Sequence, residues 1–278
     1  MDTRGPVDTG LMVDSNLEEH RTSVRGASLA WTEEGSGPTA VWCHGLSSSR
    51  DAQEVSRMFD WSPVVASGHR LVRYDARGHG GSTATPEPSD YEWRNLAQDL
   101  LALLDEVAPG ERVAGIGSSM GTATLLHAAL LDPDRFSRLV LTSPPTAWET
   151  RAAQAGFYRQ LADQVEEQGL RVFEEQMLQG PPPPPAFGDV DLTADGLGID
   201  EDAMPTIFRG AAGSDLPQPE ALAEMQVPSL LLAWSGDPGH PVVSASLLAE
   251  YLPDAVLRVA ATPEQLARWG GYAADFLR

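Results

Sequence analysis

The pentapeptide Gly117–Gly121, GSSMG, stands where the chain passes from an apolar run into a helical pattern. Residues 111–116 are short and apolar enough for a buried strand, and residues 122–131 carry apolar side chains at helical spacing before an Asp-Pro stop. A G-x-S-x-G turn at such a junction lifts a serine hydroxyl above the strand end and aims the next backbone N–H at the same point. An ordinary Gly/Ser turn is the alternative. The pattern predicts a strand–turn–helix unit with Ser119 as candidate nucleophile.

Apolar runs alternate with helical patterns along most of the chain. The expected strands are residues 39–43, 70–74, 136–141, 228–234 and 255–259, with a strand, a turn and a strand within 25–37. Helical patterns cover residues 91–107, 243–252 and 263–277. Continuous apolar strands alternating with helices are typical of a parallel sheet covered on both faces. We therefore expect an α/β fold with a mostly parallel, doubly wound sheet.

This alternation breaks between residues 147 and 219. Residues 151–169 and 170–178 are predicted to be helical, and five prolines at 181–185 precede an acidic, glycine-containing stretch. The prolines fit a stiff spacer, with a recognition motif as the alternative. The predicted parts are a flexible N-terminal arm (1–20), a core (21–146 and 220–278) and a helical lid insertion (147–219).

The charge balance limits the partners of the chain. Its 278 residues include 19 basic residues, all arginine, against 40 acidic residues, a formal charge of −21. Such a surface repels nucleic acids and anionic membranes. The sequence has no signal-peptide pattern and no apolar run long enough to cross a bilayer. We expect a cytoplasmic protein that acts on a small molecule, and no feature predicts an oligomeric state.

Cysteine and histidine usage gives no sign of a metal or another cofactor. The single cysteine, Cys43, excludes an internal disulfide, and no His/Cys cluster has zinc-ligand spacing. Cys43 lies in an expected strand, where a buried small hydrophobic residue is favoured over a nucleophile.

Four motifs follow one another in a definite order. They are His44-Gly45-Leu46 after an early strand, Asp75–Ser82 (DARGHGGS), Gly117–Gly121, and Asp237–Pro241 (DPGHP) after a late strand. In this order they resemble the α/β-hydrolase fold family, over roughly residues 25–146 and 222–278. The resemblance implies an α/β-hydrolase fold, and it is much less specific for the reaction than for the fold.

The resemblance also implies roles for these motifs. It makes Ser119 the nucleophile, places an oxyanion hole at the backbone N–H groups of Leu46 and Met120, and makes Asp237 the orienting acid. Acyl transfer needs these groups together with a base. Two alternatives remain: Asp237 as a cap of the following helix or turn, and His44-Gly45 as a tight turn in which the imidazole is structural.

The chain differs from the family in the position of the residue that serves as catalytic base. The family carries a histidine between the last strand and the last helix, where residues 259–264 here read VAATPE. Among the six histidines, His240 is the candidate base, because it follows Asp237 by three residues in a Pro/Gly-rich loop expected at the mouth of the site. An ordinary turn is the alternative. The others are expected to be solvated (His20, His69) or structural (His44, His79, His127).

The expected substrate pocket combines the early loop with lid aromatics. Its candidate residues are His44, Gly45, Trp148, Phe157 and Tyr158, and the lid aromatics fit internal lid packing equally well.

Three functions fit these residues. The first is a serine hydrolase acting on an ester, lactone or thioester of a small to mid-sized organic molecule. The second is a non-hydrolytic enzyme of secondary metabolism, a lyase, cyclase or C–C bond-forming catalyst, in which Ser119 and the oxyanion hole polarise a carbonyl. The third is a catalytically inactive ligand-binding protein.

Overall fold

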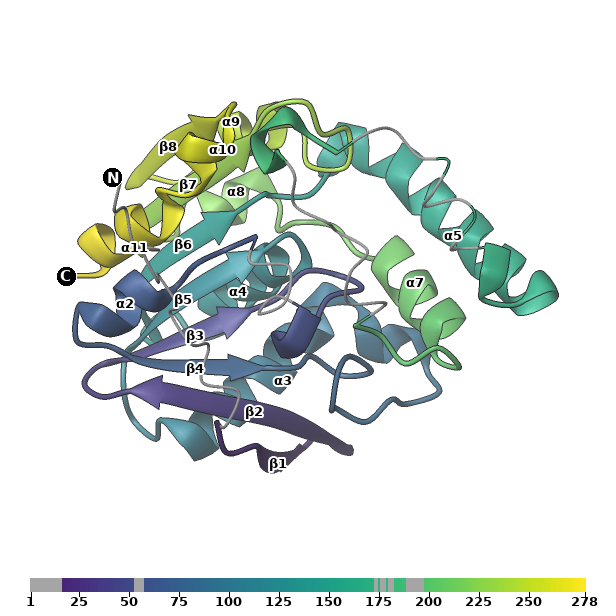
Figure 1. Cartoon of the computed structure of the whole chain (residues 1–278), viewed down its shortest axis with the longest axis horizontal. Helices are drawn as coiled ribbons and strands as arrows, with labels where there is room; N and C mark the ends of the chain where they lie inside the picture. Colours follow the sequence, from purple (N-terminus) through teal and green to yellow (C-terminus); the bar gives the residue numbers. More distant parts are fainter. Residues whose placement is uncertain (1–16, 53–57, 173–174, 176–178, 180–182, 189–197) are drawn as a thin grey trace, which may run out of the picture.

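An eight-stranded sheet forms the centre of the chain in the computed structural model, which describes residues 17–278 except 53–57, 173–174, 176–178, 180–182 and 189–197 (Figure 1). The strands are His20–Val24 (β1), Ala27–Gly35 (β2), Thr39–Cys43 (β3), Arg70–Tyr74 (β4), Val113–Ser118 (β5), Phe136–Thr142 (β6), Ser229–Trp234 (β7) and Ala255–Ala260 (β8). Their order in the sheet is β1-β2-β4-β3-β5-β6-β7-β8. The pairs β1–β2 and β2–β4 are antiparallel, and all others are parallel. The expected mostly parallel sheet is confirmed.

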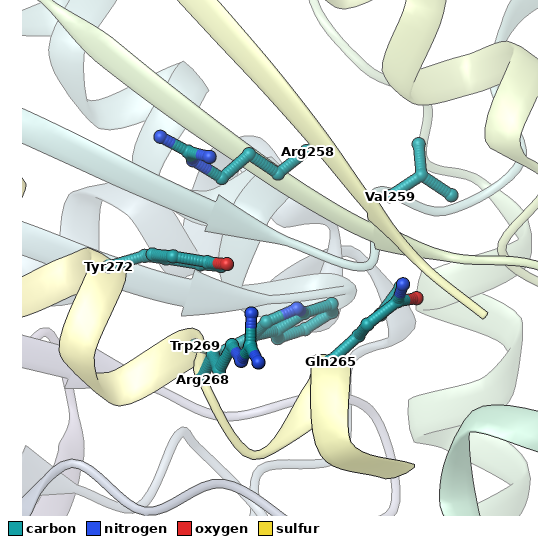
Figure 2. A pocket seen from close by; sticks show the side chains of 7 residues that line it. Arg258, Val259, Gln265, Arg268, Trp269 and Tyr272 are labelled. Atoms are coloured by element: carbon teal, nitrogen blue, oxygen red, sulfur yellow. The ribbon is translucent and has the colours of Figure 1, made fainter. Parts of the chain in front are cut away.

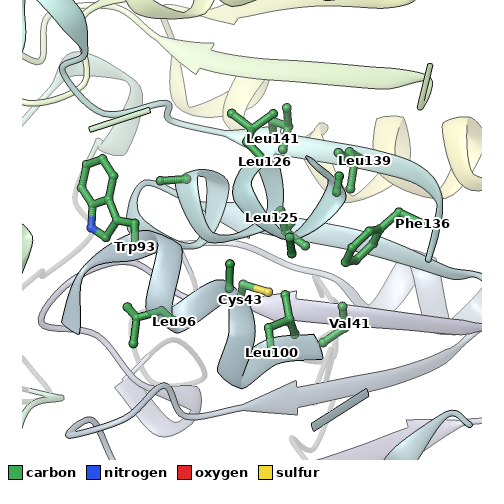
Figure 3. Close-up of a cluster of buried hydrophobic side chains, with 14 of the residues drawn as sticks. Val41, Cys43, Trp93, Leu96, Leu100, Leu125, Leu126, Phe136, Leu139 and Leu141 are labelled. Atoms are coloured by element: carbon green, nitrogen blue, oxygen red, sulfur yellow. The ribbon is translucent and has the colours of Figure 1, made fainter. Parts of the chain in front are cut away.

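Helices cover both faces of this sheet. Successive side chains of a strand point to opposite faces, so they belong to two different hydrophobic clusters. On one face, Val41 and Cys43 pack with side chains of α3 (Trp93–Val107), α4 (Met120–Leu131), α8 (Pro219–Leu222) and α9 (Val242–Tyr251), and Figure 3 shows part of this cluster. On the other face, Ala40 and Trp42 pack with α2 (Ser62–Ala66) and α11 (Trp269–Leu277), which follows the short helix α10 (Pro263–Leu266). The fold is therefore doubly wound.

Cys43 is buried in the first cluster, as its position in a strand predicts. Burial raises the pKa of the Cys43 thiol to about 12, against a smaller opposing effect of a hydrogen bond with Tyr74. The thiol therefore stays protonated near neutral pH and is a poor nucleophile.

The segment between β6 and β7 carries its own helices. Trp148–Thr150 (η2) leads into α5 (Arg151–Gln168), which packs against α7 (Met204–Ala212), and Pro185–Phe187 (η3) packs against α10. Figure 1 shows α5 and α7 beside the carboxyl ends of the central strands. Of the expected helix at 170–178 and the proline run at 181–185, several residues lie outside the described part, and Pro185 begins η3.

Sequence reasoning missed α7, which falls in the stretch interpreted as acidic and irregular. Its signal was present, because Met204, Ile207, Phe208 and Ala211 recur at helical spacing and are all buried. The nearby acidic residues obscured that pattern. Met204, Ile207 and Phe208 form a third cluster with side chains of α5 and of η1 (Pro88–Tyr91).

Two elements and the burial of one histidine also differ from expectation. The first turn lies at Arg25–Gly26, both with positive φ, so the hairpin occupies residues 20–35 and β1 begins inside the expected arm. The last helix is interrupted between α10 and α11. His69, expected to be solvated, is buried, with Nδ1 3.1 Å from the Ser67 hydroxyl.

Candidate active site

The turn at Ser119 has the strained geometry of a nucleophile elbow. Ser119 has φ 50° and ψ −107° between β5 and α4, and its N–H donates to the carbonyl of Thr142 at 3.1 Å. Both glycines of the motif are required sterically: a Cβ on Gly117 would lie 2.6 Å from Gly121, and one on Gly121 would overlap the carbonyl of Cys43. The close approach of α4 to β3 therefore holds the serine in a conformation that a side chain rarely adopts.

His240 and Asp237 complete a hydrogen-bonded chain with this serine. His240 Nε2 lies 2.8 Å from Ser119 Oγ, and His240 Nδ1 lies 2.7 Å from Asp237 Oδ2. Both residues come from the loop between β7 and α9. The structure thus brings together the three residues that the sequence selected, with acid and base three positions apart. The hydroxyl, the imidazole and the carboxylate have the mutual distances that acyl transfer requires.

The environment of Asp237 favours its ionised form. Burial by itself would raise the pKa of this carboxyl, but the hydrogen bond and charge of His240 and the hydrogen bonds from Trp234 and the Gly239 N–H hold the pKa well below its usual range. A carboxylate in this position keeps the proton of His240 on Nδ1, which leaves Nε2 free to accept a proton from Ser119.

The two proposed oxyanion donors flank the elbow. Met120 is the first residue of α4, so its N–H has no acceptor within the helix, and the helix dipole favours negative charge there. Leu46 lies in the turn after β3, where the Ser48 N–H donates to the carbonyl of Gly45 at 3.2 Å. A Cβ on Gly45 would be only 3.6 Å from the Cβ of Ser119, which shows how closely this turn approaches the nucleophile.

Both ring nitrogens of His44 form hydrogen bonds with the backbone. Its Nδ1 donates to the carbonyl of Gly45 at 2.7 Å, and its Nε2 accepts the Ala76 N–H at 2.9 Å. Burial lowers the pKa of His44, against the opposing charge of Asp75. A neutral ring with both nitrogens bonded cannot serve as a base, in agreement with the structural alternative for this residue.

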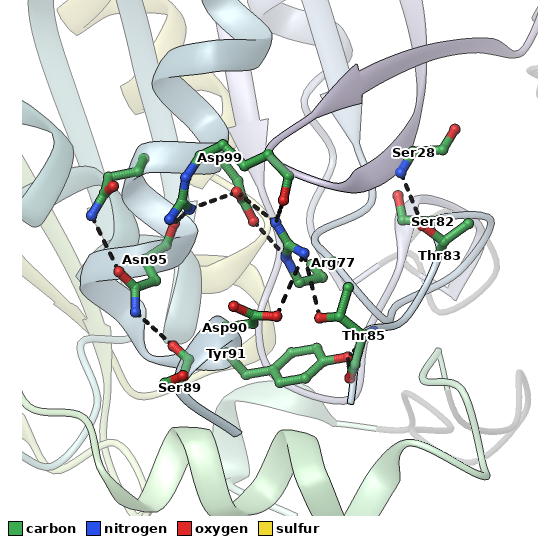
Figure 4. Close-up of polar contacts among 12 residues, drawn as sticks. Ser28, Arg77, Ser82, Thr83, Thr85, Ser89, Asp90, Tyr91, Asn95 and Asp99 are labelled. Atoms are coloured by element: carbon green, nitrogen blue, oxygen red, sulfur yellow. Dashed lines mark hydrogen bonds and ion pairs between the residues drawn. The ribbon is translucent and has the colours of Figure 1, made fainter. Parts of the chain in front are cut away.

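The DARGHGGS motif is a buried structural turn. Asp75 accepts from the guanidinium of Arg50 at 3.0 Å and from the Gly81 N–H at 2.8 Å. Arg77 makes two bonds of 2.9 Å to Asp99 of α3, as Figure 4 shows. The motif therefore fixes β4 to α3 and brings no charged group to Ser119.

The three aromatic residues expected in the lid differ in their surroundings. The Trp148 indole donates to the carbonyl of Pro217 at 3.1 Å and packs edge-on against Tyr251, while the side chain of Phe157 is 47% exposed. Tyr158 packs against Phe208. Burial raises the pKa of Tyr158, and the charge of Asp237 adds to that rise while Arg151 opposes it. Of these three residues, Tyr158 is within electrostatic reach of Asp237, and Trp148 packs against the core.

A separate cavity of about 290 Å³ lies between β8 and the helices α10 and α11 (Figure 2). It is lined by Arg258, Val259, Ala260, Gln265, Arg268, Trp269 and Tyr272. No triad residue lines it.

The comparison with known proteins agrees with this geometry. Residues 38–263 match the family model described as alpha/beta hydrolase fold. The chain belongs to the α/β-hydrolase fold family. None of the helices in the described part of this hydrolase-fold chain combines the length and apolar character needed to span a bilayer.

Relatives of this hydrolase-fold chain carry several hydrolase names. It is 31% identical over 147 residues to an epoxide hydrolase from Caballeronia sordidicola, a match covering 53% of this chain and 43% of that protein, so less than half of the relative is spanned. It is 29% identical over 199 residues to 3-oxoadipate enol-lactonase 2 from Acinetobacter baylyi, covering 68% of this chain and 69% of that protein.

Solved structures give the same family. A hydrolase from Pseudomonas aeruginosa PA01 superposes with a TM-score of 0.77 at 25% identity, over 95% of this chain and 99% of that one. The enol-lactonase from Burkholderia xenovorans LB400 gives a TM-score of 0.67 at 22% identity, over 93% and 99% of the two chains. At that lower identity the likeness concerns the fold alone.

Proposed function

We propose that this chain is a serine hydrolase that cleaves carboxylic esters or lactones of small organic molecules through an acyl-enzyme. The observation that carries the proposal is the unbroken hydrogen-bond chain from Ser119 through His240 to Asp237. The hydrolase names of the relatives support hydrolysis as the kind of reaction. Thioesters undergo the same acyl transfer and belong to the same substrate class.

In the proposed reaction, His240 Nε2 takes the hydroxyl proton as Ser119 Oγ attacks the carbonyl carbon. The backbone N–H groups of Met120 and Leu46 donate hydrogen bonds to the carbonyl oxygen and stabilise the negative charge that forms on it. The intermediate collapses, and His240 returns the proton to the leaving oxygen. Water then attacks the acyl-enzyme, again with His240 as base, and releases the acid and free Ser119.

Epoxides are disfavoured as substrates, although several relatives are named as epoxide hydrolases. Attack of Ser119 on an epoxide carbon would join enzyme and substrate through an ether. An ether has no acyl carbon for the second water to attack, so the enzyme would not be regenerated. An ester or lactone gives an acyl-enzyme, which the same triad hydrolyses.

We further propose that the segment 147–219 is a lid over this site and that Tyr158 lines the substrate pocket beneath it. The position of α5 and α7 beside the carboxyl ends of the strands supports this, because ligands of open α/β sheets bind there (Figure 1). The influence of the Asp237 charge on Tyr158 supports its place near the triad.

A fluorophosphonate probe and a series of 4-nitrophenyl esters test the reaction. We expect the probe to modify Ser119 in the wild-type protein, and Ser119→Ala or His240→Ala to lower kcat by about 10⁴-fold or more. Ser118→Ala is the matched control, because this neighbouring hydroxyl bonds to Ser143 at 3.2 Å instead of to the triad. Ester turnover retained by Ser119→Ala would overturn the acyl-enzyme, whereas a wild-type protein that is neither labelled nor active on the esters would favour a non-hydrolytic role.

A further inference from the structure

We propose that Trp234 is a positioning residue for the acid–base pair, an inference that rests on the proposed serine-hydrolase function. The indole Nε1 donates to Asp237 Oδ2 at 2.9 Å, the same oxygen that His240 Nδ1 contacts at 2.7 Å. The Gly239 N–H donates to the other oxygen, Oδ1, at 2.8 Å. These three donors fix the plane of the Asp237 carboxylate.

The loop that carries Asp237 and His240 needs this support. Every residue from 235 to 243 is at least partly exposed, and Gly236 has a positive φ of 86°. The main-chain contact between this loop and the segment after β6 is long, with the Thr146 N–H 3.3 Å from the carbonyl of Gly239. Because acid and base share one loop, any tilt of that loop moves both groups away from Ser119 together. The indole ties the carboxylate to the end of a buried strand.

Trp234 is itself held rigidly. It is the last residue of β7 and only 4% exposed. Its ring stacks on Trp269 with centroids 5.5 Å apart and an interplanar angle of 15°, and Phe187 meets it edge-on at 4.7 Å. His240 also meets the ring edge-on, at 5.6 Å. The donor is therefore fixed before substrate binds, as preorganised catalysis requires.

The loss of this N–H has a distinct kinetic signature. A hydrogen bond to a charged acceptor corresponds to about 10- to 100-fold in rate, so we expect kcat to fall by that factor. KM should stay within about twofold, because the indole is buried and bonds to Asp237.

The experiment replaces Trp234 in the full-length protein with β-(3-benzothienyl)alanine, which keeps the bicyclic shape and lacks the N–H. Incorporation of 5-fluorotryptophan at the same position is the matched control, because this analogue keeps the donor. Trp269→Phe controls for the aromatic stack, since it leaves the Trp234 donor in place. We measure kcat and KM for one 4-nitrophenyl ester and the rate of fluorophosphonate labelling.

The expected result is a 10- to 100-fold loss of kcat and of labelling rate for the benzothienyl variant alone. A benzothienyl variant with wild-type kcat would overturn the positioning role, as would an equal loss for Trp269→Phe, which would indicate packing. Failure of the proposed function is separate: the wild-type protein would then not be labelled at Ser119.

Discussion

At the scale of single residues, surroundings decide which imidazoles are available for proton transfer. His240 keeps one nitrogen on Asp237 and the other on Ser119, with 27% of its side chain exposed. His79 is fully buried: its Nδ1 bonds to the carbonyl of Arg77 at 2.9 Å, and its Nε2 has no partner within the described part of the chain. The same side chain thus serves as candidate base in one place and as a neutral structural group in another.

His79 should make folding stability sensitive to acid. Burial, reinforced by the neighbouring His44, lowers the pKa of His79 from 6.5 to about 3. Below pH 6.5, His79 therefore binds a proton in the unfolded chain but not in the folded chain. The free energy of unfolding falls as the pH is lowered from 6.5 to about 3. His79→Asn can retain a donor to Arg77 and does not titrate. We expect it to flatten the decline of unfolding free energy between pH 6.5 and 3, measured by urea unfolding, and equal slopes for both proteins would contradict this.

At the scale of elements, close packing of α4 against β3 creates the serine turn. Gly121 lies against the carbonyl of Cys43, so this contact leaves no room for a Cβ. The elbow is therefore a product of helix–strand distance as much as of the turn residues themselves.

Gly121→Ala should separate these elements. We expect a loss of about 1–3 kcal/mol in the free energy of unfolding, as in other overpacked sites, together with slower fluorophosphonate labelling. Gly156→Ala in α5 is the matched control, because a Cβ there meets no atom within 4 Å. The control should be neutral or slightly stabilising, since alanine favours helix. Wild-type stability and labelling of Gly121→Ala would refute the steric account.

Within the insertion, Arg151 joins the start of α5 to the end of α7. Its buried guanidinium donates to the carbonyls of Ala211 and Ser214 and stacks on Trp93 at 4.3 Å. It therefore supplies donors to carbonyl groups at a helix end that would otherwise lack them.

Arg151→Met should loosen this insertion more than the core. Each carbonyl left without a donor costs about 1–3 kcal/mol. We expect faster proteolytic cleavage within 147–219, measured by limited digestion and mass spectrometry. Arg209→Met provides the comparison, because it breaks exposed ion pairs with Asp163 and Glu166 that are worth about 1 kcal/mol or less. Equal cleavage of the two variants would argue against an anchoring role.

At the scale of the whole molecule, the formal charge of −21 acts on every approaching substrate. A neutral and an anionic ester of the same acyl length isolate this effect. We expect kcat/KM for mono-4-nitrophenyl adipate to be several-fold to ~10-fold below that for 4-nitrophenyl hexanoate at low ionic strength, and the ratio to shrink in 0.5 M salt, where charges are screened. A ratio unaffected by salt would show that local contacts, and not the net charge, set the difference.

The sequence predicted the fold and selected the three residues that hydrogen bonds join in the structure, because both have local signatures. Apolar strands and four ordered motifs indicated the parallel sheet. The motif after the late strand selected Asp237 as candidate acid, and the position of His240 three residues later made it the candidate base. The hydrogen bond from Trp234 to Asp237 was not predictable, because in the sequence Trp234 is only an apolar residue at the end of a strand. Its partners Phe187 and Trp269 are distant in sequence, and their contacts form only in the folded chain.

The placement of acid and base on a single loop has a consequence for how such a site can be changed. Replacing residues 237–240 adds or removes the Asp237 carboxylate and the His240 imidazole together. No second loop has to be changed at the same time. The stretch after α9, including β8, α10 and α11, carries no member of the triad. A redesign of the carboxyl-terminal part therefore leaves the three site residues in place, provided that its core packing, including Trp269 against Trp234, is kept.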